Sequence, residues 1–150
     1  LAVSEVAEIR GGDSLYSRLT DRKPDEAADG SYQLNGVPGG LPMSLFDMKV
    51  SRGIGQSPGA AISWHLDGKF RSFIAHAGVP LTVLPGTSTQ FVVIADGKEV
   101  FRSRPLTSID DPVPVSVKLN GVRMLTLRVE SSPTSHAVPG IWADPLCVNR

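Results

Sequence analysis

Two short stretches of strictly alternating residues, together with tight-turn dipeptides, restrict this chain to antiparallel β structure. In 115–119 and again in 125–129, every second residue is apolar, which is the period of a strand with one buried face. Upstream, the β-branched run Phe91–Ala95 ends at Asp96-Gly97, a dipeptide that tolerates positive φ at both corners of a hairpin. We therefore predict hairpin turns at Asp96-Gly97 and at Asn120-Gly121.

The same alternation assigns each side chain to a face. The apolar set is predicted to lie in the core, and it consists of Val115, Val117, Leu119, Leu125, Leu127 and Val129. Along the whole chain, seven or eight short apolar runs are separated by turn residues, and no convincing amphipathic helix interrupts them. This pattern predicts an all-β fold, an antiparallel β-sandwich with Greek-key or jelly-roll connections.

Length and charge limit the classes of function. A chain of 150 residues is enough for one domain, and 15 basic residues balance 15 acidic ones. Such a chain has no net positive charge to attract a phosphate backbone or an anionic lipid surface. Arg102 and Arg104 are close together in the sequence, but no wider basic stripe surrounds them. No apolar run approaches the roughly 20 residues that span a bilayer. We expect neither nucleic-acid binding nor membrane insertion.

The first residue and the single cysteine indicate what kind of protein the chain comes from and which cysteine chemistry it lacks. The chain begins at Leu1 rather than Met, so we expect a domain of a longer protein or a processed product. Its single cysteine, Cys147, excludes an internal disulfide and a multi-cysteine zinc site. Because Cys147 lies in an apolar stretch with few neighbouring cations, we predict an inert thiol.

The pattern is uneven along the chain. Residues 1–40 are poorly assigned and are predicted to pack as an N-terminal segment on a sandwich formed by 41–150. Residues 41–50 predict a strand, and 53–59 predict a glycine-rich turn. That turn does not have the glycine spacing of a phosphate-binding loop, and no helix follows it. Trp64 shares a strand face with apolar neighbours and is predicted to be buried.

Several short motifs occur in a specific order. They are Gly53-Ile54-Gly55, Ile62–Phe70, Phe73, Ala77-Gly78-Val79, Ala95–Phe101, Asp110–Val115, Leu125-Thr126-Leu127 and Trp142–Leu146. In this order and spacing the chain resembles the NPCBM family of carbohydrate-binding modules from about Leu41 to the C-terminus. The resemblance implies a galactose-binding-like jelly roll without catalytic activity, of the kind attached to bacterial glycoside hydrolases and other exported proteins.

The resemblance also implies a function. It predicts a non-catalytic module for galactose-type glycans, extracellular or periplasmic, within a larger bacterial exported protein and with a glycan or glycoprotein as its partner. Some polar loop positions differ from the family pattern: Ser57 stands where a histidine is usual, and Pro80-Leu81 where acidic residues are common. The alternative is a structural or protein-interaction β-sandwich domain that has lost the sugar site.

A sugar site needs an aromatic face for the C–H patch of the ring and polar groups for its hydroxyls. The predicted sugar contacts are His136, Trp142 and Asp144 in a loop, with Gln56 and Ser57 from the glycine-rich turn. Each of the first three has a plainer alternative: Trp142 as a core anchor, Asp144 bonded to a local backbone N–H, and His136 as an exposed loop residue. Binding is predicted to be weak, about 10⁻⁴ to 10⁻³ M.

No catalytic or metal-binding spacing is present. His65 and His76 lie in strand patterns and are predicted to face outward, and no Gly-x-Ser-x-Gly elbow occurs. We therefore expect no enzyme activity and no cofactor. Asp110-Asp111 could supply oxygens to a structural calcium ion, although two acids before a proline more often cap a turn.

Overall fold

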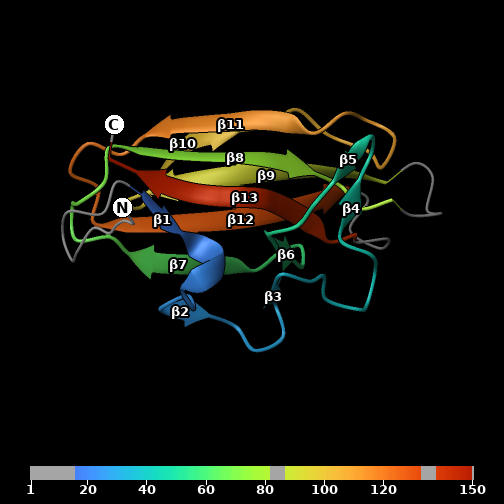
Figure 1. Cartoon of the computed structure of the whole chain (residues 1–150), viewed down its shortest axis with the longest axis horizontal. Coiled ribbons are helices and arrows are strands. Elements are labelled where there is room, and N and C mark those ends of the chain that lie inside the picture. Colours follow the sequence, from blue (N-terminus) through green and yellow to red (C-terminus); the bar gives the residue numbers. More distant parts are fainter. Residues whose placement is uncertain (1–15, 82–86, 133–137, 150) are drawn as a thin grey trace, which may run out of the picture.

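The computed structural model describes residues 16–81, 87–132 and 138–149, which form two facing antiparallel β-sheets (Figure 1). The first sheet has the order β11 (Val113–Lys118), β8 (Ser72–Gly78), β13 (Gly140–Val148), β6 (Gly53–Gln56), β3 (Tyr32–Leu34), and β1 (Tyr16–Arg18) also pairs with β13. The second sheet has the order β10 (Lys98–Arg102), β9 (Ser88–Ala95), β12 (Met124–Ser132), β7 (Ala61–His65), β2 (Glu26–Ala27). A separate hairpin pairs β4 (Ser44–Leu45) with β5 (Met48–Lys49), and the 3₁₀ turn η2 spans Leu19–Asp21. The predicted all-β sandwich is confirmed.

Most consecutive strands lie in different sheets, as in a jelly roll. The chain changes sheet between β7 and β8, between β8 and β9, and at each step from β10 to β13. At the predicted hairpin Asp96-Gly97, β9 pairs with β10 and both corners have positive φ, 50° and 80°. The prediction of a hairpin at Asn120-Gly121 is wrong. A tight turn is present there, with Gly121 at φ 74°, but it connects β11 of the first sheet to β12 of the second.

The core lies between the sheets and matches the predicted alternation. All the side chains assigned to it from 115–119 and 125–129 are buried, with exposed fractions between 0% and 6%. Trp64 is also fully buried, as predicted, and its indole N–H donates a 2.7 Å hydrogen bond to the backbone oxygen of Arg22. This bond ties the segment that precedes β2 to the centre of β7.

The glycine-rich stretch 53–59 begins as a strand rather than as a turn. Gly53–Gln56 form β6, which pairs with β13 on one side and β3 on the other. A Cβ on Gly55 would lie only 2.3 Å from the backbone oxygen of Gly36, which accepts a hydrogen bond from the Gly55 N–H at 3.0 Å. Glycine is needed at position 55 because the two backbones lie so close together. In the sequence, such a glycine cannot be distinguished from a glycine in a turn.

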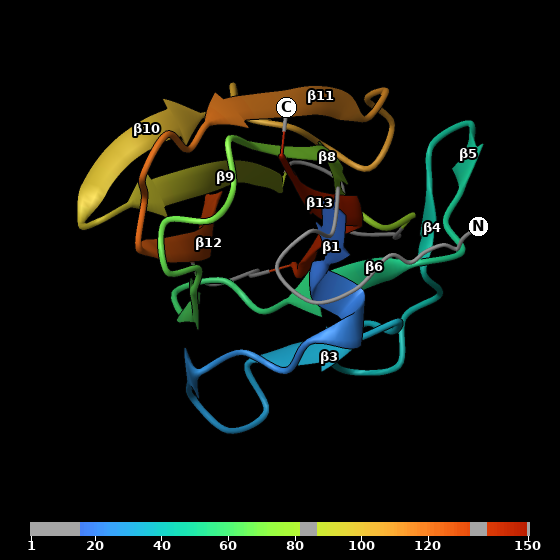
Figure 2. The same ribbon diagram turned by 60° about the vertical axis from the view of Figure 1, so that its left-hand side comes forward.

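The β4–β5 hairpin covers part of the outer face of the first sheet (Figure 2). Leu45 and Val50 from this region pack with Ile141 and Ala143 of β13 in a second apolar cluster. Gly78 of β8 allows this approach, because a Cβ there would lie 3.0 Å from the Leu45 side chain. The strand predicted for 41–50 is therefore two very short strands, with a corner at Asp47, where φ is 57°.

The N-terminal segment contributes strands to both sheets. Of residues 1–40, the described part from Tyr16 onward supplies β1 and β3 to the first sheet and β2 to the second. In the described ranges, no helix is long and apolar enough to cross a membrane.

Cys147 is fully buried on β13, and burial raises the pKa of its thiol to about 12 because the thiolate would lose its hydration. At pH 8 only about one native molecule in 10⁴ then carries the reactive thiolate. We expect the folded protein to resist an aromatic disulfide reagent at pH 8 and to react promptly once unfolded in guanidinium chloride. Absorbance of the released thiol measures both rates, and rapid labelling of the folded protein would refute this placement.

Candidate functional site

Strand β13 contains a bulge at Asp144-Pro145. Ala143 pairs with His76 of β8 and Leu146 with Ile74, so two residues of β13 stand opposite one of β8. Asp144 has a φ of 48°, a left-handed conformation that aspartate adopts more readily than most residues. Proline has no N–H to give to a central strand and is accommodated at such a bulge. As a result the Asp144 side chain leaves the ladder and is 59% exposed.

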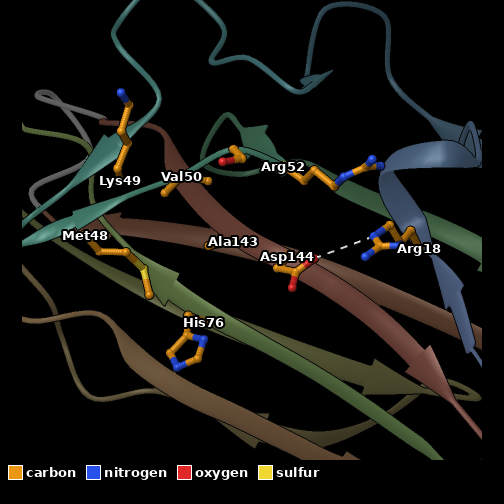
Figure 3. Close-up of a pocket in the computed structure, with 9 residues that line it drawn as sticks. Arg18, Met48, Lys49, Val50, Arg52, His76, Ala143 and Asp144 are labelled. Carbon is orange, nitrogen blue, oxygen red and sulfur yellow. Dashed lines mark ion pairs between the residues drawn. The ribbon is translucent and has the colours of Figure 1, made fainter.

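A pocket of about 410 Å³ lies over this bulge, on the outer face of the first sheet (Figure 3). Its lining comes from β1, β5, the β5–β6 connection, β8 and β13: Arg18, Met48, Lys49, Val50, Ser51, Arg52, His76, Ala143 and Asp144. The hairpin strand β5 forms one side of the pocket and β1 another. The strand pairing therefore brings together residues that are far apart in the sequence.

The charged groups of the pocket form only loose ion pairs. Arg18 Nε lies 4.0 Å from Asp144 Oδ1, beyond hydrogen-bond length, and the Arg18 guanidinium stacks over the Tyr16 ring at 5.1 Å. Arg52 Nη1 lies 3.4 Å from Asp21 Oδ1, and both of these side chains are about half exposed or more. Exposed pairs of this kind contribute little, about 0–1 kcal/mol. The Arg52 guanidinium can therefore exchange its partner Asp21 for a ligand at small cost.

The backbone positions Arg52 next to Asp144. The Asp144 N–H donates a 2.8 Å hydrogen bond to the backbone oxygen of Arg52, which holds the β5–β6 connection against the bulge. Val50 and Ala143 belong to the second apolar cluster, and Met48 packs against it. The pocket thus has an apolar part bordered by a carboxylate, guanidinium groups and the exposed imidazole of His76, the combination that binds small polar ligands.

Two of the predicted sugar contacts, Trp142 and Gln56, lie in the core instead. The Trp142 side chain is fully buried and makes edge contacts with Phe91 and Phe73 at ring-centroid distances of 5.1 and 6.2 Å. Its indole N–H donates a 2.9 Å hydrogen bond to Gln56 Oε1, and Gln56 Nε2 in turn donates to the backbone oxygen of Leu127. Neither side chain has a surface for a sugar. Trp142 is the core anchor given above as its alternative.

The structure separates the remaining predicted contacts. Ser57 follows the last residue of β6, is half-buried, and donates its backbone N–H to the Ser31 oxygen at 2.8 Å. Asp144 neighbours the other end of β6, where Ala143 pairs with Gly53. The length of that strand puts roughly 15 Å between the two positions. His136 lies outside the described residues.

Other residues of the pocket carried no signal in the sequence. Arg18 lies in the poorly assigned segment, and Arg52 precedes a stretch that resembled a turn. His76 was predicted to be an outward-facing strand residue, as was His65, and both are exposed. Only the pairing of β8 with β13 shows that His76 lies beside the bulge.

Asp110 caps its own turn. Its Oδ2 accepts hydrogen bonds from the Thr107 backbone N–H at 2.7 Å and from the Thr107 hydroxyl at 3.1 Å. The backbone bond, followed by the hydroxyl bond and the nearby Arg104, lowers the pKa of this carboxyl. This is the plainer of the two roles predicted for Asp110-Asp111. Over residues 16–81, 87–132 and 138–149, no group of three or more His, Cys, Asp or Glu side chains is arranged to hold a metal ion.

Arg102 at the end of β10 and Arg104 in the loop that follows have acidic partners. Arg102 contacts Glu130 at 2.7 Å and Glu99 at 2.9 Å, and Arg104 lies 3.8 Å from Asp110. The hydrogen bonds from Arg102 lower the pKa of both glutamates. These positive charges are therefore largely balanced within the protein itself.

A sequence profile of the NPCBM/NEW2 domain matches residues 16–146. The chain belongs to this family. NPCBM domains are non-catalytic carbohydrate-binding modules, which confirms the expectation that this domain is not an enzyme. The match starts at the beginning of β1, inside the segment that the sequence pattern left poorly assigned. No curated protein sequence matched the chain.

Solved structures share the fold of this NPCBM/NEW2 domain. The CBM51 module of Clostridium perfringens GH95, in complex with methyl-galactose, is 22% identical with a TM-score of 0.73, over 89% of this chain and 99% of that one. The CBM51-2 and INT domains of C. perfringens ZmpB are 19% identical with a TM-score of 0.77, over 89% of this chain and 31% of that one. The tandem CBM51 modules of Streptococcus pneumoniae Sp3GH98 are 17% identical with a TM-score of 0.76, over 96% of this chain and 51% of that one. These similarities confirm the galactose-binding-like β-sandwich.

Proposed function

We propose that this NPCBM/NEW2 domain binds galactose-type sugars on a glycan or glycoprotein and so holds a larger bacterial protein on that glycan, outside the cell or in the periplasm. Family membership supports sugar binding, and the similar CBM51 module of C. perfringens GH95 was solved with methyl-galactose. The other similar structures belong to longer chains, of which this domain spans 31% and 51%. The sugar bound to the first of these modules and the greater length of the other two chains support a tethering role.

The observation that carries the proposal for this chain is the pocket at Asp144. A sugar ring has an apolar C–H patch, which Met48 and Val50 can contact, and hydroxyls that need charged or polar partners. The Asp144 carboxylate accepts hydrogen bonds from such hydroxyls, and Arg18 and Arg52 donate to their oxygens. Among the described residues, no phenylalanine, tyrosine or tryptophan lines this pocket, so a large stacking surface is missing there and affinity is weak, about 10⁻³ M.

The interaction-domain alternative rests on a different observation. The aromatic side chain predicted to face a sugar, Trp142, is buried, and Ser57 replaces the histidine usual in the family. A domain that had kept only the sandwich would show both features. A screen of the purified domain against a glycan array separates the two functions, because only the first predicts glycan binding.

We expect Asp144→Asn to weaken binding of methyl-galactose about tenfold, because one charged hydrogen-bond acceptor is lost. Asparagine also tolerates the left-handed φ of 48°, so the free energy of unfolding should change by less than about 0.5 kcal/mol. A titration followed by nuclear magnetic resonance (NMR) gives the two dissociation constants.

Asp67→Asn is the matched control, since Asp67 is an exposed aspartate with a φ of 56° in the turn between β7 and β8. It should bind like the unmodified domain. Undiminished binding by Asp144→Asn would move the site away from this pocket, toward Ser57 and His136. If the unmodified domain binds no glycan at millimolar concentration, the sugar-binding function itself is rejected.

A further inference from the structure

The pocket at Asp144 carries an excess of positive charge in a chain that has none overall. Arg18, Lys49 and Arg52 line it, and Asp144 is the one carboxylate among the described residues that do so. The whole chain, in contrast, has 15 basic and 15 acidic residues. The local excess therefore arises from how the strands place these side chains and not from composition.

The protein does not neutralise these cations tightly. Lys49 has no ion-pair partner among the described residues, and the Arg52–Asp21 pair joins two exposed side chains at 3.4 Å. Asp144 is 4.0 Å from Arg18 Nε, which is buried and lacks a hydrogen-bond partner in the described part of the chain. The contrast is Arg102, which has carboxylates at 2.7 and 2.9 Å. The positive charge of the pocket is thus left for a ligand.

We infer that this pocket selects sugars that carry a negative charge, with galacturonic acid as the simplest galactose-type example. The inference rests on the proposed function and names its ligand class. A carboxylate on the ring can form paired hydrogen bonds with the Arg52 guanidinium, whose planar fork fits that geometry. Ring hydroxyls remain for Asp144, and the C–H face lies against Met48 and Val50. A neutral sugar offers the cations only hydroxyl groups.

The position of Arg52 makes it the cation to test. Its backbone oxygen is bonded to the Asp144 N–H, while its side chain is 49% exposed and bonded only loosely to Asp21. Replacing the side chain therefore leaves the bulge and the backbone bond in place. Arg18 is less suitable, because its guanidinium also stacks on Tyr16.

The experiment compares galacturonic acid with galactose on the full chain by NMR titration at low ionic strength. We expect galacturonic acid to bind about tenfold more tightly, since a charge-assisted pair replaces a neutral hydrogen bond. Arg52→Gln should remove most of that preference, because galacturonic acid loses a charge-assisted pair whereas galactose loses only a hydrogen bond from Arg52 to a neutral hydroxyl. Lys98→Gln, the same charge change at the start of β10 in the other sheet, should leave both affinities unchanged. Added salt should reduce the preference, because exposed charges are screened.

The outcomes separate this inference from the proposed function. Equal binding of galactose and galacturonic acid would overturn the inference and leave sugar binding intact. Binding of neither sugar, nor of any array glycan, would overturn the proposed function itself. A preference that persists in the double variant Lys49→Gln/Arg52→Gln would also overturn the inference, because the charge of the pocket would not be its source.

Discussion

Replacing Trp142 with alanine should unfold a large fraction of the domain. The indole is fully buried between the sheets, with the Phe91 ring 5.1 Å away at 90° and the Phe73 ring 6.2 Å away at 62°. Truncating a buried tryptophan costs about 3–5 kcal/mol, and total stabilities of natural domains are about 5–15 kcal/mol. The change also leaves the buried Gln56 Oε1 without its donor, which adds about 1–3 kcal/mol.

Urea unfolding followed by far-ultraviolet circular dichroism measures this loss without relying on tryptophan fluorescence. Trp142→Phe is the control, since it keeps an aromatic ring in the same space and removes only the N–H and part of the volume. It should be clearly more stable than Trp142→Ala. An alanine variant with the unfolding midpoint of the original domain would mean that Trp142 is not a core residue.

Leu127→Ala should destabilise the domain by about 2–5 kcal/mol, because it leaves a cavity between the sheets. Leu127 is fully buried at the centre of β12, where it pairs with Ile62 of β7 and Val93 of β9. With strands on both sides, the backbone has little freedom to collapse into the space. The backbone oxygen that Gln56 uses is retained, so the loss reports the side chain alone.

The same chemical change at an exposed position is the control. Leu81 is 46% exposed, and Leu81→Ala should alter the free energy of unfolding by less than about 1 kcal/mol. Differential scanning calorimetry on the two variants compares them directly. Similar losses for both leucines would contradict the assignment of faces in 125–129.

Local alternation was enough to predict β11, β12 and the faces of their side chains, but not which sheet each strand joins. The β11–β12 segments were correctly assigned to the core, because period-2 burial is a property of each strand alone. The turn at Asn120-Gly121 was predicted for the same local reason. Its dipeptide permits a tight reversal, yet the two strands then pair with different neighbours, β8 and β9. That choice depends on contacts far apart in sequence.

Two features of the predicted site differ from the structure. Glycines 53 and 55 indicated a turn, although at least Gly55 serves close packing against Gly36 in a strand. Trp142 and Asp144 were predicted to contact a sugar from a loop, with Trp142 as a core anchor given as the alternative. In the structure, β13 is paired on both edges, and its bulge absorbs the proline without ending the strand.

Of the pocket, only Asp144 could be predicted from the sequence. Arg18 and Asp144 are separated by most of the chain. They meet because β1 pairs with β13, which places Arg18 opposite Leu146, two residues from Asp144. Arg52 and His76 reach the same place through β6 and β8. Single-sequence patterns describe one strand at a time, so a site built from several strands leaves no local signature.

The most direct test of sugar binding at this pocket is an NMR titration of the ¹⁵N-labelled domain with methyl-galactose, read residue by residue. The proposal predicts that the backbone amides of Lys49, Arg52, His76 and Asp144 shift progressively, while the buried indole N–H of Trp142 stays unchanged. Shifts confined to the region around Ser57, with the pocket residues unaffected, would contradict the proposed site. No shift anywhere at millimolar sugar would contradict sugar binding by this domain.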